Sequence, residues 1–331
     1  MLTGGFPEPY TFGRRLVQYF EKEKPDYDIV HDNQSLCYGV LQLQEKGIPV
    51  ITTIHHPITS DLEIALKNAD NWKSRLLIRR WHSFLCMQKK VVPRLDRLVT
   101  VSSASRKDIA RAFKIETSKI SVVHNGIDTK VFRPLPEVER NPFRVMVTAS
   151  ADAPLKGLNY LPEAVAALIP EYPELELLVL GKLKEDGANK KLIVRLKIGK
   201  HLRFVSGIKT EAIVKLYAEA SLVVVPSIYE GFGLPAAEAM ACGLPVISTD
   251  GGALPEVVGN CGIIVPTRNA KAIASAIKEL LGDTDKQDQL GRRARARIVE
   301  LFSWKIAARN MVELYSCRTG VKKANDVVTD D

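Results

Sequence analysis

The sequence predicts an α/β protein whose sheets are parallel. Short runs rich in Val and Ile, such as Leu222–Pro226 and Pro245–Thr249, have the composition of strands buried on both faces. Segments with helical spacing follow most of these runs, and Gly, Pro or Asn occupy many of the joints. Two such series are separated by the proline-rich, aperiodic stretch Pro134–Pro142. This pattern predicts two Rossmann-like domains joined by that stretch.

Length and composition agree with two globular domains. The chain has 331 residues, of which 46% are hydrophobic and 26% charged. No apolar run approaches the roughly 20 residues that span a bilayer, and the start has no signal-peptide pattern, so a cytoplasmic location is expected. The five cysteines are scattered without a Cys-x-x-Cys pair, which predicts reduced thiols and no metal site.

The first half of the chain reads as alternating helices and strands. Polar residues end each apolar run, and Ser102 can cap the helix that follows it. The expected helices are Phe12–Lys22, Leu36–Lys46, Lys73–Val91 and Arg106–Phe113, and the expected strands are Ile29–His31, Pro49–Ile54, Leu98–Val101 and Ile120–Val123.

A pair of histidines follows the second of these strands. His55 and His56 come directly after Ile54, at the carboxyl end of the strand. Ligands of open α/β sheets bind at this edge, so His55 is expected to face the cleft between the domains. The alternative is a loop histidine bonded to neighbouring backbone.

Positive charge is concentrated in one segment. The formal net charge is +9, and residues 67–97 hold nine basic residues against Asp70 and Asp96. Trp81 and Phe84 lie among them, a mixture that suits an anionic membrane surface. A solvated helix whose aromatic residues belong to the core is the alternative. Nucleic acid is not favoured, because no recognised module surrounds the patch.

The second half gives a longer series of the same kind, followed by a polar tail that is expected to be disordered. The expected strands are Arg144–Thr148, Glu174–Leu180, Leu202–Ser206, Leu222–Pro226, Pro245–Thr249 and Gly262–Pro266, and the expected helices are Leu161–Ile169, Glu211–Ala218, Ala236–Ala241, Ala270–Leu281, Gln289–Phe302 and Ser303–Tyr315.

The stretch Ser227–Glu256 carries the strongest chemical signal. Gly231 and Gly233 permit a tight turn, after which a helix begins with free N–H groups and a positive dipole end. Such a helix start is a seat for phosphate. Glu230 and Glu238 lie on either side, where they can bond hydroxyl groups, so two sugars joined by a diphosphate would fit. Lys156, in a loop after an earlier strand, can offset charge on a leaving diphosphate.

The run Glu-Gly-Phe-Gly-Leu-Pro-x-x-Glu-Ala-Met-Ala-Cys-Gly-Leu-Pro-Val, from Glu230 to Val246, resembles the donor-site signature of retaining glycosyltransferases with the GT-B fold, in glycosyltransferase family 4 (glycosyl transferases group 1). This resemblance implies two Rossmann-like domains that face each other across a cleft. The implied division is 1–135 for the first domain, 143–302 for the donor domain, 303–318 for a helix that crosses back, and 319–331 for a disordered tail.

The resemblance also implies roles for individual residues. Glu238 would bind the donor ribose, Glu230 the sugar hydroxyls, and His55 the donor sugar. Lys156, Glu230 and His55 are thus the expected catalytic residues, and the expected donor-binding residues are Glu238, Phe232, Gly233, Leu234, Gly207 and Ile208. The implied reaction moves a hexosyl group from a UDP- or GDP-sugar to a lipid or saccharide hydroxyl, with retention, and without metal or cofactor.

Two departures from the family pattern leave a second hypothesis open. Ala151 stands where the family has a phosphate-binding arginine, and the first domain is expected to lack its first strands. Their loss would leave an unpaired apolar edge beside the strand Ile29–His31, covered by a second copy or a partner. A non-catalytic sugar-nucleotide-binding subunit is therefore the alternative function.

Overall fold

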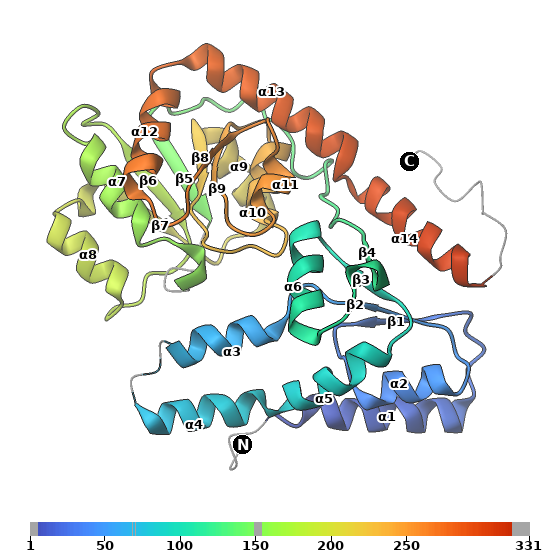
Figure 1. Cartoon of the computed structure of the whole chain (residues 1–331). Coiled ribbons are helices and arrows are strands. Elements are labelled where there is room, and N and C mark those ends of the chain that lie inside the picture. The colour runs from blue at the N-terminus through green and yellow to red at the C-terminus, as the bar shows by residue number, and fades with distance from the viewer. Residues whose placement is uncertain (1–5, 68, 70, 149–153, 320–331) are drawn as a thin grey trace. The chain divides into compact units, whose positions relative to one another are not determined.

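The computed structural model describes residues 6–67, 69, 71–148 and 154–319. The chain forms two compact units (Figure 1). Unit 1 comprises Met1–His124 with Arg309–Asp331, and unit 2 comprises Asn125–Ala308. Both contain parallel sheets with helices, as the alternation of strands and helices predicts, so the α/β fold class is confirmed.

The sheet of unit 1 is four-stranded and parallel, in the order β1-β2-β3-β4. One face is covered by α1, α2, α5 and α6, whose apolar side chains enclose a core that includes Leu43, Val91 and Ile109. The strands are β1 (Val30–Asn33), β2 (Val50–Thr53), β3 (Leu98–Thr100) and β4 (Ile120–Val122), and the helices are α1 (Glu8–Glu23), α2 (Tyr38–Glu45), α3 (Ile58–Lys67), α4 (Trp72–Trp81), α5 (Leu85–Val91) and α6 (Ser103–Phe113).

The last helix, α14 (Trp304–Thr319), covers the other face of this sheet (Figure 1). Met311 and Leu314 pack there on Ile51 and Val99. The helix starts in unit 2, and its residues from Arg309 onward belong to unit 1. It continues to Thr319, where the tail was expected to begin, and residues 320–331 lie outside the described part of the chain.

The strand β1 forms one edge of the first sheet, and β2 is its only strand partner among the described residues. An unpaired edge at this strand is thus confirmed, but its expected apolar character is wrong. The strand reads Val-His-Asp-Asn, and His31 and Asn33 are exposed. A second copy or partner at this edge stays a prediction.

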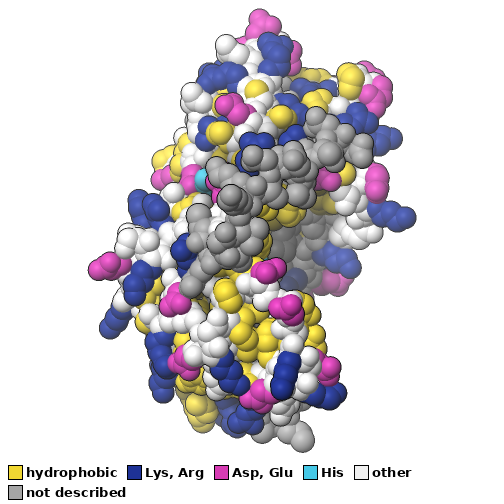
Figure 2. Space-filling model, turned by 90° about the vertical axis from the view of Figure 1, so that its right-hand side faces the viewer, with side chains coloured by type: hydrophobic (Ala, Val, Ile, Leu, Met, Phe, Trp, Pro, Cys, Tyr) yellow, Lys and Arg dark blue, Asp and Glu magenta, His cyan; other side chains and the backbone are white. Residues whose placement is uncertain are grey.

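Figure 2 shows hydrophobic side chains gathered on the lower part of the face drawn there.

The predicted helix Lys73–Val91 is interrupted. The structure has α4, a short 3-10 turn over His82–Phe84, and α5. The ring Nδ1 of His82 lies 2.8 Å from the carbonyl oxygen of Ile78, and Phe84 turns into the core. The break separates an exposed segment from a buried one, a division that the 3–4 spacing of apolar residues did not indicate.

The sheet of unit 2 is six-stranded and parallel, in the order β10-β9-β8-β5-β6-β7. Helices cover both of its faces, with α7 and α12 packed together on one side (Figure 1). The strands are β5 (Arg144–Thr148), β6 (Glu176–Leu180), β7 (Leu202–Val205), β8 (Leu222–Val225), β9 (Val246–Thr249) and β10 (Ile263–Val265), and the helices are α7 (Tyr160–Leu168), α8 (Ala188–Leu196), α9 (Thr210–Glu219), α10 (Leu234–Ala241), α11 (Leu254–Val258), α12 (Ala270–Leu281) and α13 (Thr284–Leu301).

The boundary between the units falls after His124, earlier than the expected linker Pro134–Pro142. The segment that enters unit 2 is held there by Arg295, whose guanidinium donates hydrogen bonds to the carbonyl oxygens of Thr129 and Phe132. Because these bonds hold the segment to α13, it packs as part of unit 2.

Candidate functional site

The candidate site lies where the strand order of the second sheet reverses. The chain proceeds from β5 outward to β6 and β7, then returns to β8 on the other side of β5. In open parallel sheets this reversal leaves a crevice at the carboxyl ends of the two adjacent strands. Lys156 follows β5 and Glu230 follows β8, so the two residues lie on either side of the reversal.

Gly157 holds the two loops together. Its φ of +62° is left-handed, and an added Cβ would lie 2.0 Å from the carbonyl oxygen of Pro226. The backbone N–H of Ile228 also donates a 2.7 Å hydrogen bond to the carbonyl of Leu155. The loop after β5 therefore contacts the loop after β8 backbone to backbone, which places Lys156 beside Glu230.

Lys156, Glu230 and Ser227 form one polar cluster. The Lys156 ammonium lies 2.8 Å from Oε1 of Glu230, and the Ser227 hydroxyl donates to the same oxygen at 2.8 Å. Glu230 is 9% exposed, whereas 31% of the Lys156 side chain remains accessible. A half-buried ammonium held by one carboxylate retains further donors for an anion.

A second glycine turn supports the loop that carries Glu230. An added Cβ on Gly252, whose φ is +63°, would lie 2.3 Å from the Glu230 carbonyl oxygen. That oxygen accepts a 2.9 Å hydrogen bond from the N–H of Ala253. The Thr249 hydroxyl donates to the carbonyl of Ser227. The Glu230 loop is thus fixed from both sides by main-chain contacts.

The helix α10 begins immediately after this loop. Gly233 caps it with a φ of +105°, and an added Cβ would lie 2.8 Å from Cδ2 of Leu254. The side chain of Phe232 is buried against Phe302, with ring centroids 5.8 Å apart, whereas Leu234 is exposed. Phe232 can therefore offer only its backbone to a ligand. The first turn of α10 carries no acidic residue, so its positive end is not neutralised there.

Glu238 has a separate environment from Glu230. The Tyr217 hydroxyl donates to Oε2 of Glu238 at 3.4 Å and lies 3.2 Å from Oγ1 of Thr148. Burial raises the pKa of Glu238 to about 7, and the bond from Tyr217 opposes this rise. Hydrogen bonds donated by the hydroxyl groups of a ligand would stabilise the ionised form of this carboxyl group.

Gly207 and Ile208 follow β7, at the edge of the same sheet. Gly207 is exposed, has a φ of +71°, and has no described atom within 4 Å of an added Cβ. Because all strands of the sheet are parallel, this turn shares the carboxyl edge with the turns after β5 and β8. The predicted base-binding position therefore lies on the same edge as Lys156 and Glu230.

His55 belongs to unit 1, at the carboxyl end of β2. Its Nε2 lies 2.7 Å from Oδ1 of Asn33, and its backbone N–H donates to Oε1 of Gln34 at 2.6 Å. Burial lowers the pKa of His55, and the nearby His56 lowers it further. The lowered pKa favours the neutral ring, whose Nε2–H tautomer would donate to Oδ1 of Asn33. Ala151 lies outside the described residues.

Sequence reasoning missed three contributors to these contacts. Ser227, Tyr217 and Asn33 were given no role, although each bonds a predicted site residue. Ser227 lay within the motif, and Asn33 ended a strand, so both had a weak positional signal. Tyr217 had none, because its bond to Glu238 joins α9 to α10.

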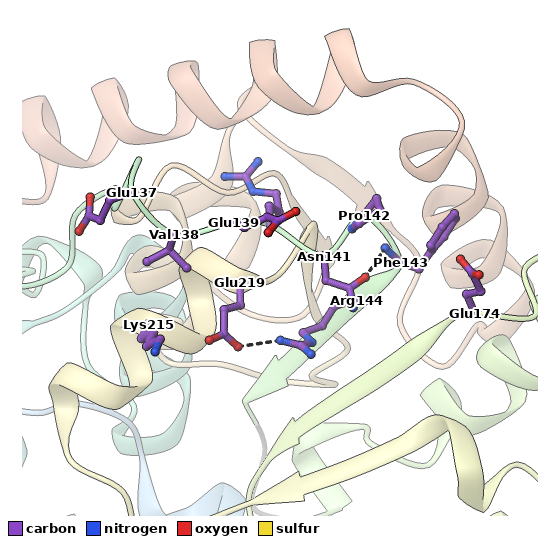
Figure 3. Close-up of a pocket in the computed structure, with 11 residues that line it drawn as sticks. Glu137, Val138, Glu139, Asn141, Pro142, Phe143, Arg144, Glu174, Lys215 and Glu219 are labelled. Carbon is purple, nitrogen blue, oxygen red and sulfur yellow. Dashed lines mark hydrogen bonds and ion pairs between the residues drawn. The ribbon is translucent and has the colours of Figure 1, made fainter.

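The pocket drawn in Figure 3 is separate from the candidate site. Arg144 lines this pocket and pairs with Glu219 at 2.7 Å (Figure 3). Its guanidinium also pairs with Glu176 at 2.8 Å. Arg144 starts β5, so this pocket opens at the amino ends of the strands, opposite the candidate site.

Within the described residues, no three His, Cys, Asp or Glu side chains are grouped as a metal site requires. None of the described helices has both the length and the hydropathy of a membrane span.

Comparison with known families matches one family model to each half of the chain. The model of glycosyl transferases group 1 matches residues 133–297, and that of glycosyltransferase family 4 matches residues 2–131. The chain is 42% identical over 316 residues to the MMP alpha-(1->4)-mannosyltransferase of Mycolicibacterium hassiacum, covering 95% of this chain and 76% of the relative. It is 30% identical to a D-inositol 3-phosphate glycosyltransferase of Streptomyces avermitilis, over 92% and 68% of the two chains.

Solved structures show the same fold. Sucrose-phosphate synthase from Thermosynechococcus elongatus is 26% identical with a TM-score of 0.72, covering 92% of this chain and 77% of that one. Anabaena HepE, solved in complex with UDP, is 19% identical with a TM-score of 0.75, covering 93% and 82%. The GT-B fold is thereby confirmed.

Proposed function

The chain belongs to glycosyltransferase family 4, the glycosyl transferases group 1, and on that premise we propose that it is a retaining hexosyltransferase. Its donor would be a UDP- or GDP-sugar and its acceptor a lipid or saccharide hydroxyl. The observation that carries this proposal is the cluster of Lys156, Glu230 and Ser227 at the reversal of the sheet, next to the unneutralised start of α10.

The Lys156 ammonium supports departure of the diphosphate, because it retains donors beyond its bond to Glu230. The bond between the anomeric carbon and the phosphate oxygen breaks, and the acceptor oxygen bonds the same carbon from the same face. The acceptor proton passes to the departing phosphate. Lys156 and the N–H groups at the start of α10 stabilise the charge that develops, which is why no metal or cofactor is proposed.

The two glutamates serve different parts of the donor. Glu230 is fixed by Lys156 and Ser227 through one oxygen, so it orients sugar hydroxyls instead of attacking carbon. Glu238 binds the ribose, with Tyr217 orienting its carboxyl group. His55, from unit 1, contacts the donor sugar in this proposal.

Backbone groups make the remaining contacts with the donor in this proposal. Gly207 and Ile208 hold the nucleotide base, and Phe232, Gly233 and Leu234 offer main-chain groups to the sugar and phosphate. The exposed, left-handed turn at Gly207 and the buried ring of Phe232 support this assignment, because both leave the backbone as the binding group.

The relative at 42% identity favours mannose as the transferred hexose, since its name describes an alpha-(1->4)-mannosyltransferase. An α product from an α-linked nucleotide sugar is formed with retention. HepE was solved with UDP, and the same kind of nucleotide is proposed here. The proposed location is cytoplasmic, with peripheral attachment to the inner face of a membrane.

Nucleotide binding gives the first test. Calorimetry with UDP and GDP in the presence of a chelator is expected to show binding to the wild type. Glu238→Ala should weaken it by about 1.5–3 kcal/mol, or roughly 10- to 150-fold. Glu211→Ala, at an exposed glutamate in the first turn of α9, is the matched control and should bind normally. Equal affinity in the two variants would remove the role of Glu238.

Product analysis gives the second test. Transfer of mannose to a saccharide acceptor, followed by NMR of the anomeric proton, is expected to show the donor's configuration. An inverted product would contradict retention. Saturable nucleotide binding without turnover on lipid and saccharide acceptors would favour the non-catalytic subunit.

A further inference from the structure

The helix α4 (Trp72–Trp81) has no buried residue. Four large apolar side chains on it are exposed, namely Trp72 at 69%, Leu76 at 58%, Leu77 at 57% and Trp81 at 42%. Its neighbour in the chain, α5, has the opposite character, since Leu85 and Met87 are core residues. The exposed apolar surface therefore belongs to α4 and not to the whole basic segment.

The charge on this helix has one sign. From Asn71 to Leu95 the sequence contains no Asp or Glu. Among the described residues, no carboxylate pairs with Lys73, Arg79 or Arg80 of α4. By contrast, Arg94 beyond α5 is paired with Glu45 at 2.6 Å. The unpaired cations thus lie on α4 together with the exposed apolar groups.

Helical geometry mixes the two kinds of side chain on one surface. At 100° per residue, the half-buried Ser74 and Ile78 define the inner side of α4. The outer side then alternates apolar and basic residues, and the Lys73 ammonium lies 5.8 Å from the ring centroid of Trp72. Long basic side chains whose stems lie along apolar groups suit the boundary between a bilayer and water.

We propose that α4 is a docking surface for an anionic lipid bilayer. Each basic side chain near such a surface strengthens binding roughly fivefold, and tryptophan favours the headgroup region. A second copy of the chain fits less well, because a two-fold interface would bring the same unpaired cations together. The inference deepens the proposed peripheral location by assigning it to one helix.

Vesicle flotation tests the proposal with matched charge changes. The triple variant Lys73→Glu, Arg79→Glu, Arg80→Glu is compared with Lys190→Glu, Lys191→Glu, Arg195→Glu on α8, which carries the same charge change on another exposed basic helix. The wild type is expected to bind vesicles of phosphatidylcholine with phosphatidylglycerol, and to release them at high salt. The α4 variant should bind at least about tenfold more weakly and the α8 variant like the wild type.

Tryptophan fluorescence tests the insertion separately. The chain has three tryptophans, of which Trp304 lies on α14 and outside this surface. Trp304→Phe should keep a blue shift on addition of anionic vesicles, whereas the double variant Trp72→Phe, Trp81→Phe should lose it. Unchanged calorimetric binding of UDP or GDP in the α4 variant shows that it is folded, and separates this test from the proposed transferase activity.

Several results would overturn the docking surface. Equal flotation on neutral and anionic vesicles would remove the charge argument, and equal loss in the α4 and α8 variants would remove the assignment to α4. A native mass of two chains that becomes one chain in the α4 variant would show that a second copy occupies the surface.

Discussion

The carbonyl oxygen of Pro226 lies 2.0 Å from the position that a Cβ atom on Gly157 would occupy. This contact joins the turn after β5 to the end of β8, and Lys156 immediately precedes Gly157 in the chain. The distance from the Lys156 ammonium to Glu230 therefore depends on the absence of a side chain at position 157.

Gly157→Ala is expected to reduce both stability and nucleotide affinity. The left-handed φ of +62° would cost about 1–3 kcal/mol with a side chain, and the Cβ would displace backbone as well. Gly47→Ala is the control, because Gly47 has a φ of +86° but no described atom near an added Cβ. Urea unfolding and calorimetry compare the two. Equal losses would show that the contact with Pro226 does not matter.

The titration of Glu238 is expected to affect stability. Its pKa in the folded chain is about 7, above the ordinary value of 4.5, so the folded state holds the proton more tightly than the unfolded state. This contribution is present at low pH and is lost as the pH rises through 7. Between pH 5 and 8 the free energy of unfolding of the wild type should fall by about 2 kcal/mol relative to that of Glu238→Gln. Parallel pH profiles from urea unfolding would contradict the raised pKa.

Tyr217→Phe is expected to shift the pH dependence of nucleotide binding upward. The tyrosine hydroxyl lowers the pKa of Glu238, so its removal should raise that pKa further. If the ionised carboxylate binds ribose, affinity rises with pH through this titration, and the midpoint moves to higher pH in the variant. Tyr172→Phe is the control, since that ring lies against Phe143 instead. Calorimetry between pH 6 and 9 measures the midpoint in each variant. An unmoved midpoint in Tyr217→Phe would contradict the coupling between Tyr217 and Glu238.

Arg144→Leu is expected to cost about 3 kcal/mol in the free energy of unfolding. The side chain of Arg144 is 14% exposed and neutralises Glu176 and Glu219, which would be left together without a cation. The comparison is Arg94→Leu, because the Arg94 side chain is 60% exposed and, among the described residues, pairs only with Glu45. That change should cost about 1 kcal/mol or less. Similar losses in denaturant titrations would show that burial does not distinguish the two pairs.

Local signals predicted the six strands of the second half of the chain, but they did not indicate the helix α8. The runs around Val223 and Ile247 became interior strands, and the predicted turn at Gly233 is followed by a helix. These features depend on residues near each other in sequence, where periodicity and glycine placement act directly. The interruption after Trp81 was not predicted, because the apolar spacing is nearly the same in the exposed α4 and the buried α5.

The sequence by itself determined the α/β class, the glycine turns and the charged residues of the candidate site, because each depends on local backbone preference or on one motif. The tertiary structure decided which of these residues meet. Lys156 and Glu230 are 74 positions apart and come into contact because β5 and β8 are adjacent in the sheet. Tyr217 reaches Glu238 because α9 and α10 are neighbours in the fold, and that contact helps to set the pKa of the carboxyl group. Strand order and burial are collective properties of the packed chain, so no single segment could reveal them.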